Sequence, residues 1–181
     1  MAVAKSIIFL AFPLFFCTSS VLFLRCNAVT ETMINDICKQ TEDPGFCVNI
    51  LRSDPRTDGA RDMHGLALIS ISLTSILVQE TLDKIPDILK GINDTVGEQR
   101  MSVCNSDYVG ALAKFRDAFS STDKRSYGDS INSIRDGTNL VIDCQNIYRR
   151  NDPIAESPLA AENMKVFKLS GIMLTIISSL G

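Results

Sequence analysis

Four cysteines form the part of this sequence that is best equipped for chemistry, because cysteines in pairs can be oxidised to disulfides. The chain of 181 residues holds six cysteines, but two of them lie within residues 1–28, which resemble a cleavable secretory signal. The other four are Cys38, Cys47, Cys104 and Cys144. An even number of cysteines in an oxidising compartment predicts two disulfides, for which three pairings are possible.

The amino-terminal segment has the parts of a secretory signal. Lys5 gives it a positive start, residues 7–16 are a short apolar stretch, and Ala28 is a small residue of the kind that signal peptidase prefers. A retained membrane anchor is the alternative, since residues 7–24 approach the length of a membrane span. Pro13 and the polar residues after it weaken that alternative. We therefore expect cleavage after Ala28 and a secreted mature chain.

The remaining candidate chemistry lacks the partners that it would need. His64 is the only histidine and no C-x-x-C spacing occurs, so no metal site is predicted. Residues 128–130, Gly-Asp-Ser, resemble the nucleophile segment of some esterases, but they fall in the first turn of a predicted helix without a general base. Asp83 and Asp87 could be read as the carboxylate pair of a glycosidase, but they lie at helical spacing on a polar face and no cleft is implied. We expect no enzyme, no cofactor and no metal.

Two of the cysteines fall on a pair of predicted helices. Apolar residues recur at steps of three and four on both sides of a polar break at residues 120–126, which favours two antiparallel helices. They are Tyr108, Ala111, Leu112, Phe115, Ala118 and Phe119 before the break, and Tyr127, Ile131, Ile134, Val141, Cys144 and Tyr148 after it. Ser126 and Asp129 form a capping box for the second helix. Cys104 and Cys144 each lie roughly 25–30 Å from the turn, so a disulfide could join the helices there.

The first two cysteines belong to a short helical hairpin predicted over residues 29–56. Thr30 caps its first segment, and Pro44 with Gly45 is expected to turn the chain before its second. Eight residues separate Cys38 from Cys47, so a local disulfide is geometrically easy. A hairpin of this length is too short to be stable alone.

Residues 57–181 are predicted to supply four long helices. The first spans residues 58–90, with a kink or a fresh helical segment at Pro86. Its expected core face consists of Leu66, Ile69, Leu73, Ile76, Leu77, Ile85 and Leu89. A loop at residues 91–97 follows, and it carries a glycosylation sequon that predicts an exposed, modifiable Asn93.

The last helix is expected to begin at Ser157 and Pro158, a helix cap followed by a proline. Polar residues interrupt its apolar end, residues 169–181, which favours an amphipathic helix over a lipid-anchor tail. The prediction is thus an all-α fold: an up-down-up-down four-helix bundle preceded by a helical hairpin, in one domain over residues 29–181. Loss of the signal changes the formal charge from −3 to −5. The sequence contains no basic stripe, so nucleic-acid binding is not expected.

These features together resemble the plant invertase/pectin methylesterase inhibitor family. The likeness covers essentially the whole mature chain, and the four-cysteine frame in a helical context is its most specific part. Local segments agree: Asp-Pro-Arg at 54–56, Leu-Ala-Leu-Ile-Ser at 66–70, Ser-Tyr-Gly-Asp-Ser-Ile-Asn at 126–132, Cys-Gln-Asn-Ile-Tyr at 144–148 and Lys-Leu-Ser at 168–170. Residues 66–90 are most similar to a pollen-allergen subgroup described as invertase inhibitors. The resemblance implies the pairs Cys38–Cys47 and Cys104–Cys144.

The resemblance also implies a function. It suggests a glycoprotein of the plant apoplast that occludes the active-site cleft of acid invertase or pectin methylesterase in a 1:1 complex. The alternative is a non-inhibitory, allergen-like binding protein with the same fold.

The residues that would contact a target follow from the same resemblance. Pectin methylesterase inhibitors typically carry a threonine just before the fourth cysteine, where this chain has Asp143. Invertase inhibitors present Pro-Lys-Phe at the entry to the third bundle helix, and the matching residues here are Arg125, Ser126 and Tyr127. We therefore expect target contacts among Lys124, Arg125, Ser126, Tyr127 and Asp143. A solvated turn and a core-facing Tyr127 are the alternatives for the first four.

Overall fold

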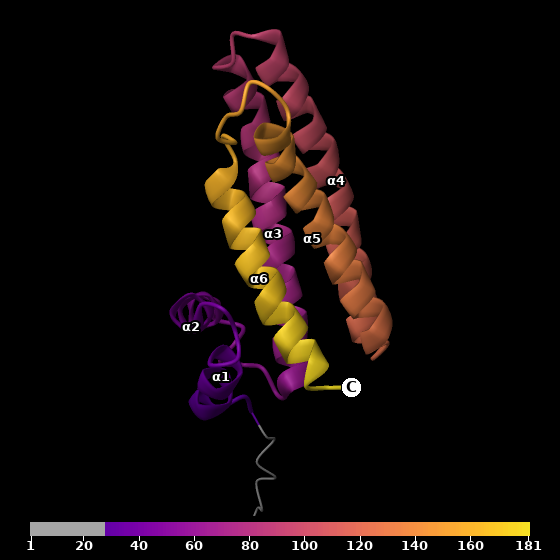
Figure 1. Cartoon of the computed structure of the whole chain (residues 1–181). Coiled ribbons are helices and arrows are strands. Elements are labelled where there is room, and N and C mark those ends of the chain that lie inside the picture. Colours follow the sequence, from indigo (N-terminus) through magenta and orange to yellow (C-terminus); the bar gives the residue numbers. More distant parts are fainter. Residues whose placement is uncertain (1–27) are drawn as a thin grey trace, which may run out of the picture.

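The computed structural model describes residues 28–181, which form six α-helices and no strand. The four long helices lie side by side as an up-and-down bundle, and the two short ones form a hairpin beside α6 (Figure 1). The expected all-α class is confirmed, while the signal predicted over residues 1–28 lies, except for Ala28, outside the described residues. The helices are α1 (Glu31–Cys38), α2 (Pro44–Ser53), α3 (Met63–Lys90), α4 (Thr95–Asp123), α5 (Tyr127–Arg150) and α6 (Ala160–Ser178).

Both expected disulfides are present. Cys38 and Cys47 join α1 to α2 with their Cα atoms 5.4 Å apart, and Cys104 and Cys144 join α4 to α5 with their Cα atoms 4.6 Å apart. All four residues are fully buried. Each disulfide is therefore part of the packed core rather than a surface clip.

The predicted inner faces of α4 and α5 are largely correct. Tyr108 and Phe115 of α4 are fully buried, as is Ile134 of α5. Phe119 is an exception with 40% exposure, because the buried stripe of α4 continues from Phe115 through Ala118 to Thr122 and turns Phe119 outward.

The predicted inner face of α3 is partly wrong. Ile76 is 47% exposed, and several of the other apolar residues assigned to that face are only half-buried. The buried stripe instead includes small hydroxyl residues: Leu66, Ala67, Ser70, Ile71, Thr74, Val78, Thr81 and Ile85. Thr74 and Thr81 can be buried because each donates its hydroxyl to a carbonyl one turn earlier. α3 has the length and hydropathy of a membrane span, but it packs in the bundle against α4 and α6.

Several element boundaries differ from the prediction because polar caps override the expected turns. Pro44 does not turn the chain but occupies the first turn of α2, where its missing N–H costs nothing, and Asp43 accepts from the N–H of Phe46. α3 begins at Met63, capped by Asp62, and runs through Pro86 without starting a fresh segment. Pro86 is exposed, so water can reach the carbonyl that it leaves unbonded.

Two further starts were placed inaccurately. α4 begins at Thr95, because Asp94 caps it by accepting from the N–H of Gly97, so the preceding loop covers only residues 91–94. α6 begins at Ala160 rather than at Pro158. Ser157 does accept from the N–H of Leu159, but this bond closes a turn just before the helix.

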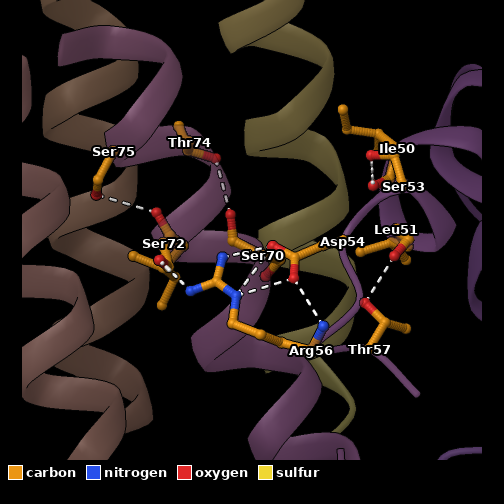
Figure 2. Close-up of polar contacts among 11 residues, drawn as sticks. Ile50, Leu51, Ser53, Asp54, Arg56, Thr57, Ser70, Ser72, Thr74 and Ser75 are labelled. Atoms are coloured by element: carbon orange, nitrogen blue, oxygen red, sulfur yellow. Dashed lines mark hydrogen bonds and ion pairs between the residues drawn. The ribbon is translucent and has the colours of Figure 1, made fainter. Parts of the chain in front are cut away.

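The α1–α2 hairpin is attached to the bundle by polar contacts at both of its sides. On α6, Lys168 pairs with Asp43 at 2.7 Å and lies over the ring of Phe46. After α2, the buried Asp54 accepts from the backbone and side chain of Arg56, whose guanidinium also donates to Ser72 of α3 (Figure 2). The Arg56 guanidinium lowers the pKa of Asp54, so this carboxylate stays charged where the hairpin meets α3.

Candidate functional site

The turn between α4 and α5 lies at the same end of the bundle as the start of α3 and residue 181 (Figure 1). α4 ends at Asp123, and only residues 124–126 connect it to α5. Lys124, Arg125 and Ser126 are exposed, and Tyr127 is half-buried. The polar break expected at residues 120–126 is thus shorter than predicted, and its two cationic residues, Lys124 and Arg125, are exposed at the end of the bundle.

Arg125 has an unusual backbone conformation. Its φ angle is 60°, in the left-handed region that strongly favours glycine, and it is the only such non-glycine residue within residues 28–181. An L-residue in this conformation costs about 1–2 kcal/mol. The turn therefore keeps an arginine where a glycine would be more stable, a kind of strain that tends to occur at functional positions.

The expected capping box at the start of α5 is absent. Ser126 occupies the cap position, but its side chain accepts no hydrogen bond there. Its backbone N–H instead donates to the carbonyl of Ser121, which closes the turn against the end of α4. The N–H of Arg125 also donates to the carbonyl of Thr122, so α4 ends in a Schellman motif with Arg125 at the left-handed position that glycine usually occupies.

Tyr127 is restrained by residues from three parts of the chain. Its hydroxyl lies 3.2 Å from Nδ1 of His64 at the start of α3, and Arg125 donates to the same oxygen at 3.3 Å. Gly181 approaches the ring so closely that a Cβ on it would lie 3.2 Å from a ring carbon. Tyr127 therefore links the turn to the start of α3 and to Gly181, and its hydroxyl accepts a hydrogen bond from the neighbouring Arg125.

A pair of buried hydroxyls lies directly beneath the turn. Thr122 and Ser130 lie 2.7 Å apart through their side-chain oxygens, and Ser130 also donates to the carbonyl of Ala118. Both residues are fully buried. Ser130, the serine of the Gly-Asp-Ser segment, is consequently occupied in joining α4 to α5.

Asp143 lies well away from the turn. It is exposed on α5 beside the Cys104–Cys144 disulfide, 16 residues and roughly 24 Å along the helix from Tyr127. Its neighbour across the helix pair is Asp107 of α4, which has one carboxyl oxygen that is buried and without a hydrogen-bond partner. Burial, and secondly the charge of Asp143, raise the pKa of Asp107.

The five predicted contact residues therefore form two separate regions. Residues 124–127 share the turn, and Asp143 belongs to a negative pair on the side of the α4–α5 hairpin. Sequence reasoning missed His64 as a partner of Tyr127, and it missed Asp107 as a partner of Asp143. Helical periodicity places Asp107 next to the buried Tyr108, a signal that it borders the helix interface, but nothing in the sequence links residue 64 to residue 127.

The remaining predicted site is Asn93, which is exposed in the loop before α4. This loop lies at the opposite end of the bundle from the α4–α5 turn (Figure 1). No group of three or more histidine, cysteine or acidic side chains within residues 28–181 is arranged to hold a metal ion.

Comparison with known proteins gives a consistent match. A family model described as plant invertase/pectin methylesterase inhibitor matches residues 32–176. Pectinesterase inhibitor 5 of Arabidopsis thaliana is 39% identical over 88% of this chain and 89% of its own length. Cell wall / vacuolar inhibitor of fructosidase 2, also of Arabidopsis thaliana, is 31% identical over 81% of each chain.

Solved structures agree on the fold. The crystal structure of a mutant form of a pectin methylesterase inhibitor from Arabidopsis matches with a TM-score of 0.71 and 20% identity, over 82% of this chain and 97% of that one. A second Arabidopsis thaliana pectin methylesterase inhibitor structure matches with a TM-score of 0.60 over 84% of this chain and 99% of that one.

Proposed function

Because this chain belongs to the plant invertase/pectin methylesterase inhibitor family, we propose that it inhibits a cell-wall carbohydrate enzyme, and that its target is pectin methylesterase. The family is one of inhibitors, which agrees with the expectation that the chain is not an enzyme. The 39% identity to a pectinesterase inhibitor over nearly the full length carries the choice of target. The proposal includes secretion after cleavage at Ala28, so that residues 29–181 meet the enzyme in the cell wall.

Occlusion of a cleft requires a rigid surface and no reactive group. The buried Cys104–Cys144 disulfide and a shared core fix α4 and α5 before any encounter, so little conformational entropy is lost on docking. The negative pair Asp107–Asp143 lies on this rigid hairpin. It favours a target that places a lysine or arginine opposite it, and one such surface per chain fits a 1:1 complex.

Acid invertase is the second candidate target. Two observations favour it: the 31% identity to a fructosidase inhibitor and the exposed Lys124–Arg125 pair at the turn. Arginine is enriched among residues that dominate binding energies, and Arg125 donates a hydrogen bond to the hydroxyl of Tyr127. In this case the end of the bundle, rather than its side, would enter the active site.

A parallel inhibition assay separates these candidates. Oxidised protein covering residues 29–181 is titrated against a plant pectin methylesterase and a plant acid invertase between about pH 4 and 7. We expect saturable inhibition of the methylesterase, weakened at least tenfold by Asp143→Lys and unchanged by Arg125→Ala. Invertase inhibition that is lost in Arg125→Ala would establish the second candidate instead. Inhibition of neither enzyme would leave a non-inhibitory, allergen-like bundle.

Glycosylation at Asn93 would leave the turn surface, residues 124–127, free. The side chain is exposed and follows α3 at the end of the bundle away from residues 124–127. Protein from a plant secretory host should lose mass on treatment with an endoglycosidase, whereas Asn93→Gln should not. We expect the same inhibition with and without the glycan.

A further inference from the structure

A groove of ≈ 530 Å³ runs between α5 and α6. Its apolar part is formed by Ile142 of α5 with Met164 and Phe167 of α6, which are 36%, 53% and 43% exposed. Large apolar side chains gathered around a concave surface are typical of small-molecule sites, and the volume lies in the usual range for them.

Hydrogen-bond donors gather at one end of this groove. Tyr108 donates to the Oδ1 atom of the buried Asn163, and Asn163 in turn donates to Oε1 of Gln145 at 2.6 Å. Within residues 28–181 the NH₂ group of Gln145, which lines the groove, donates no hydrogen bond, so it can serve as a donor to a ligand. Arg149 lies one turn further along α5 on the same lining and takes part in no ion pair among residues 28–181.

The start of α6 adds to this polar end. Ala160 and Ala161 line the groove at the first turn of the helix, and no side chain caps that turn. The N–H of Ala160 already donates to the carbonyl of Ser157, so an anion there is favoured by the helix dipole and the remaining N–H groups of the turn. Because α5 and α6 are antiparallel, Arg149 on one helix and Ala160 on the other lie at the same end, and Ile142 and Phe167 lie at the other (Figure 1). The groove is thus apolar at one end and cationic at the other.

We propose that this groove binds a small organic acid with an apolar, ring-sized body. The body lies against Met164 and Phe167, and the carboxylate or sulfonate accepts from Gln145 and Arg149. From Ile142 to Arg149 the helix rises about 10 Å, which sets the length of the ligand. Glu156 is the one anionic group on the lining, so it opposes the ligand and tunes its affinity.

A matched pair of fluorescent probes tests the proposal without any target enzyme, so its failure is independent of the inhibitor assignment. The probes are 8-anilinonaphthalene-1-sulfonate and its uncharged counterpart N-phenyl-1-naphthylamine. We expect the folded protein to bind one equivalent of the sulfonate with a Kd at least fivefold lower than that of the uncharged amine. Equal affinities for the two probes would overturn the assignment of an acid.

Four variants locate the site. Arg149→Gln should weaken sulfonate binding roughly tenfold, the usual worth of a charge-assisted hydrogen bond, and change amine binding less than twofold. Glu156→Gln should strengthen sulfonate binding about threefold, and Met164→Glu should abolish binding of both probes. Arg150→Gln is the matched control, because Arg150 is an exposed neighbour on α5 that does not line the groove. Equal losses in Arg149→Gln and Arg150→Gln, or full binding by Met164→Glu, would overturn the proposal.

Folding is checked for each variant by near-ultraviolet circular dichroism, since these dyes also bind loosened cores. Should Met164→Glu lose its native spectrum, Phe167→Ala replaces it and should weaken both probes at least fivefold. Unchanged binding by a natively folded Phe167→Ala would likewise contradict a site between α5 and α6.

Discussion

The α4–α5 hairpin is closed by different means at its two ends. At the disulfide end, Cys104 and Cys144 link the helices covalently in the core. At the turn end, residues 122–130, the link is a three-residue turn supported by the buried hydroxyls of Thr122 and Ser130. The disulfide end is therefore held by one covalent bond, whereas the turn end is held by several hydrogen bonds that are individually weak.

Each end also carries one unfavourable feature beside its strong link. At the disulfide end, Asp107 and Asp143 are like charges, and an oxygen of Asp107 is buried without a partner. At the turn end, Arg125 has a left-handed backbone conformation. Both features involve residues of the two proposed docking surfaces. The comparison suggests that the links supply the stability that lets binding residues adopt locally costly arrangements.

Removal of the disulfide at the first end should have the largest effect. The double variant Cys104→Ala/Cys144→Ala should lose about 4 kcal/mol of unfolding free energy, because the cystine closes a loop of 40 residues in sequence. Cys38→Ala/Cys47→Ala should lose about 3 kcal/mol, since its loop is shorter. Urea denaturation measures both. A larger loss of unfolding free energy in Cys38→Ala/Cys47→Ala would show that loop length does not determine which disulfide contributes more stability.

The hydroxyl pair at the turn end should contribute less. Thr122→Val keeps the shape of the side chain but leaves Ser130 without one of its partners, so it should lower the unfolding free energy by about 1–2 kcal/mol. Thr122→Val/Ser130→Ala removes both polar groups and should cost less than the sum of the single variants. Additive losses in this double-mutant cycle would mean that the two hydroxyls act independently.

Relief of the strained turn should stabilise the protein by a smaller amount. Arg125→Gly removes the steric cost of the left-handed conformation, partly offset by greater freedom of the unfolded chain, for a net gain of roughly 0.5–1 kcal/mol. Lys124 is the matched control: its φ is −81°, so Lys124→Gly should destabilise instead. Thermal melts of the two variants should shift in opposite directions, and shifts in the same direction would rule out strain at Arg125.

Much of the fold could be predicted from the sequence because periodicity and cysteine spacing are local signals. The hairpin, the bundle and both disulfide pairs were expected, and Tyr108, Phe115 and Ile134 were assigned correctly to the core. The inner face of α3 was predicted partly wrongly, because the prediction chose the most apolar residues. Hydrophobicity alone does not show that Thr74 and Thr81 can be buried by donating their hydroxyls to carbonyls of the same helix.

The sites were less predictable, because they depend on contacts between distant residues. Residue types around the turn suggested a contact surface, but not the left-handed Arg125 or the bond between His64 and Tyr127, which lie 63 positions apart. In the same way, Asp143 could be singled out by a family comparison, while its pairing with Asp107 requires the packing of α4 on α5. Whether these residues bind a target stays a prediction for the inhibition assay.

The charge conflict at the disulfide end should have the smallest and most pH-dependent effect. Because the pKa of Asp107 is raised in the folded state, the folded protein binds more protons than the unfolded chain just above the ordinary value of 3.8. The unfolding free energy therefore falls as the pH rises through that window, and the penalty remains at neutral pH. Asp107→Asn should be more stable than the wild type at pH 7 and should lose this advantage below about pH 3.8.

Asp143→Asn sharpens the test, since it removes only the second cause of the shift and leaves the burial of Asp107 unchanged. Its gain at pH 7 should be smaller than that of Asp107→Asn. Urea unfolding of both variants at intervals from pH 3.5 to 7 would reveal the difference. A gain in Asp107→Asn that is equal at every pH would mean that packing or hydrogen bonding, rather than charge, is responsible. In that case, repulsion between Asp107 and Asp143 would not destabilise the disulfide end, and the left-handed Arg125 at the turn end would have no electrostatic counterpart.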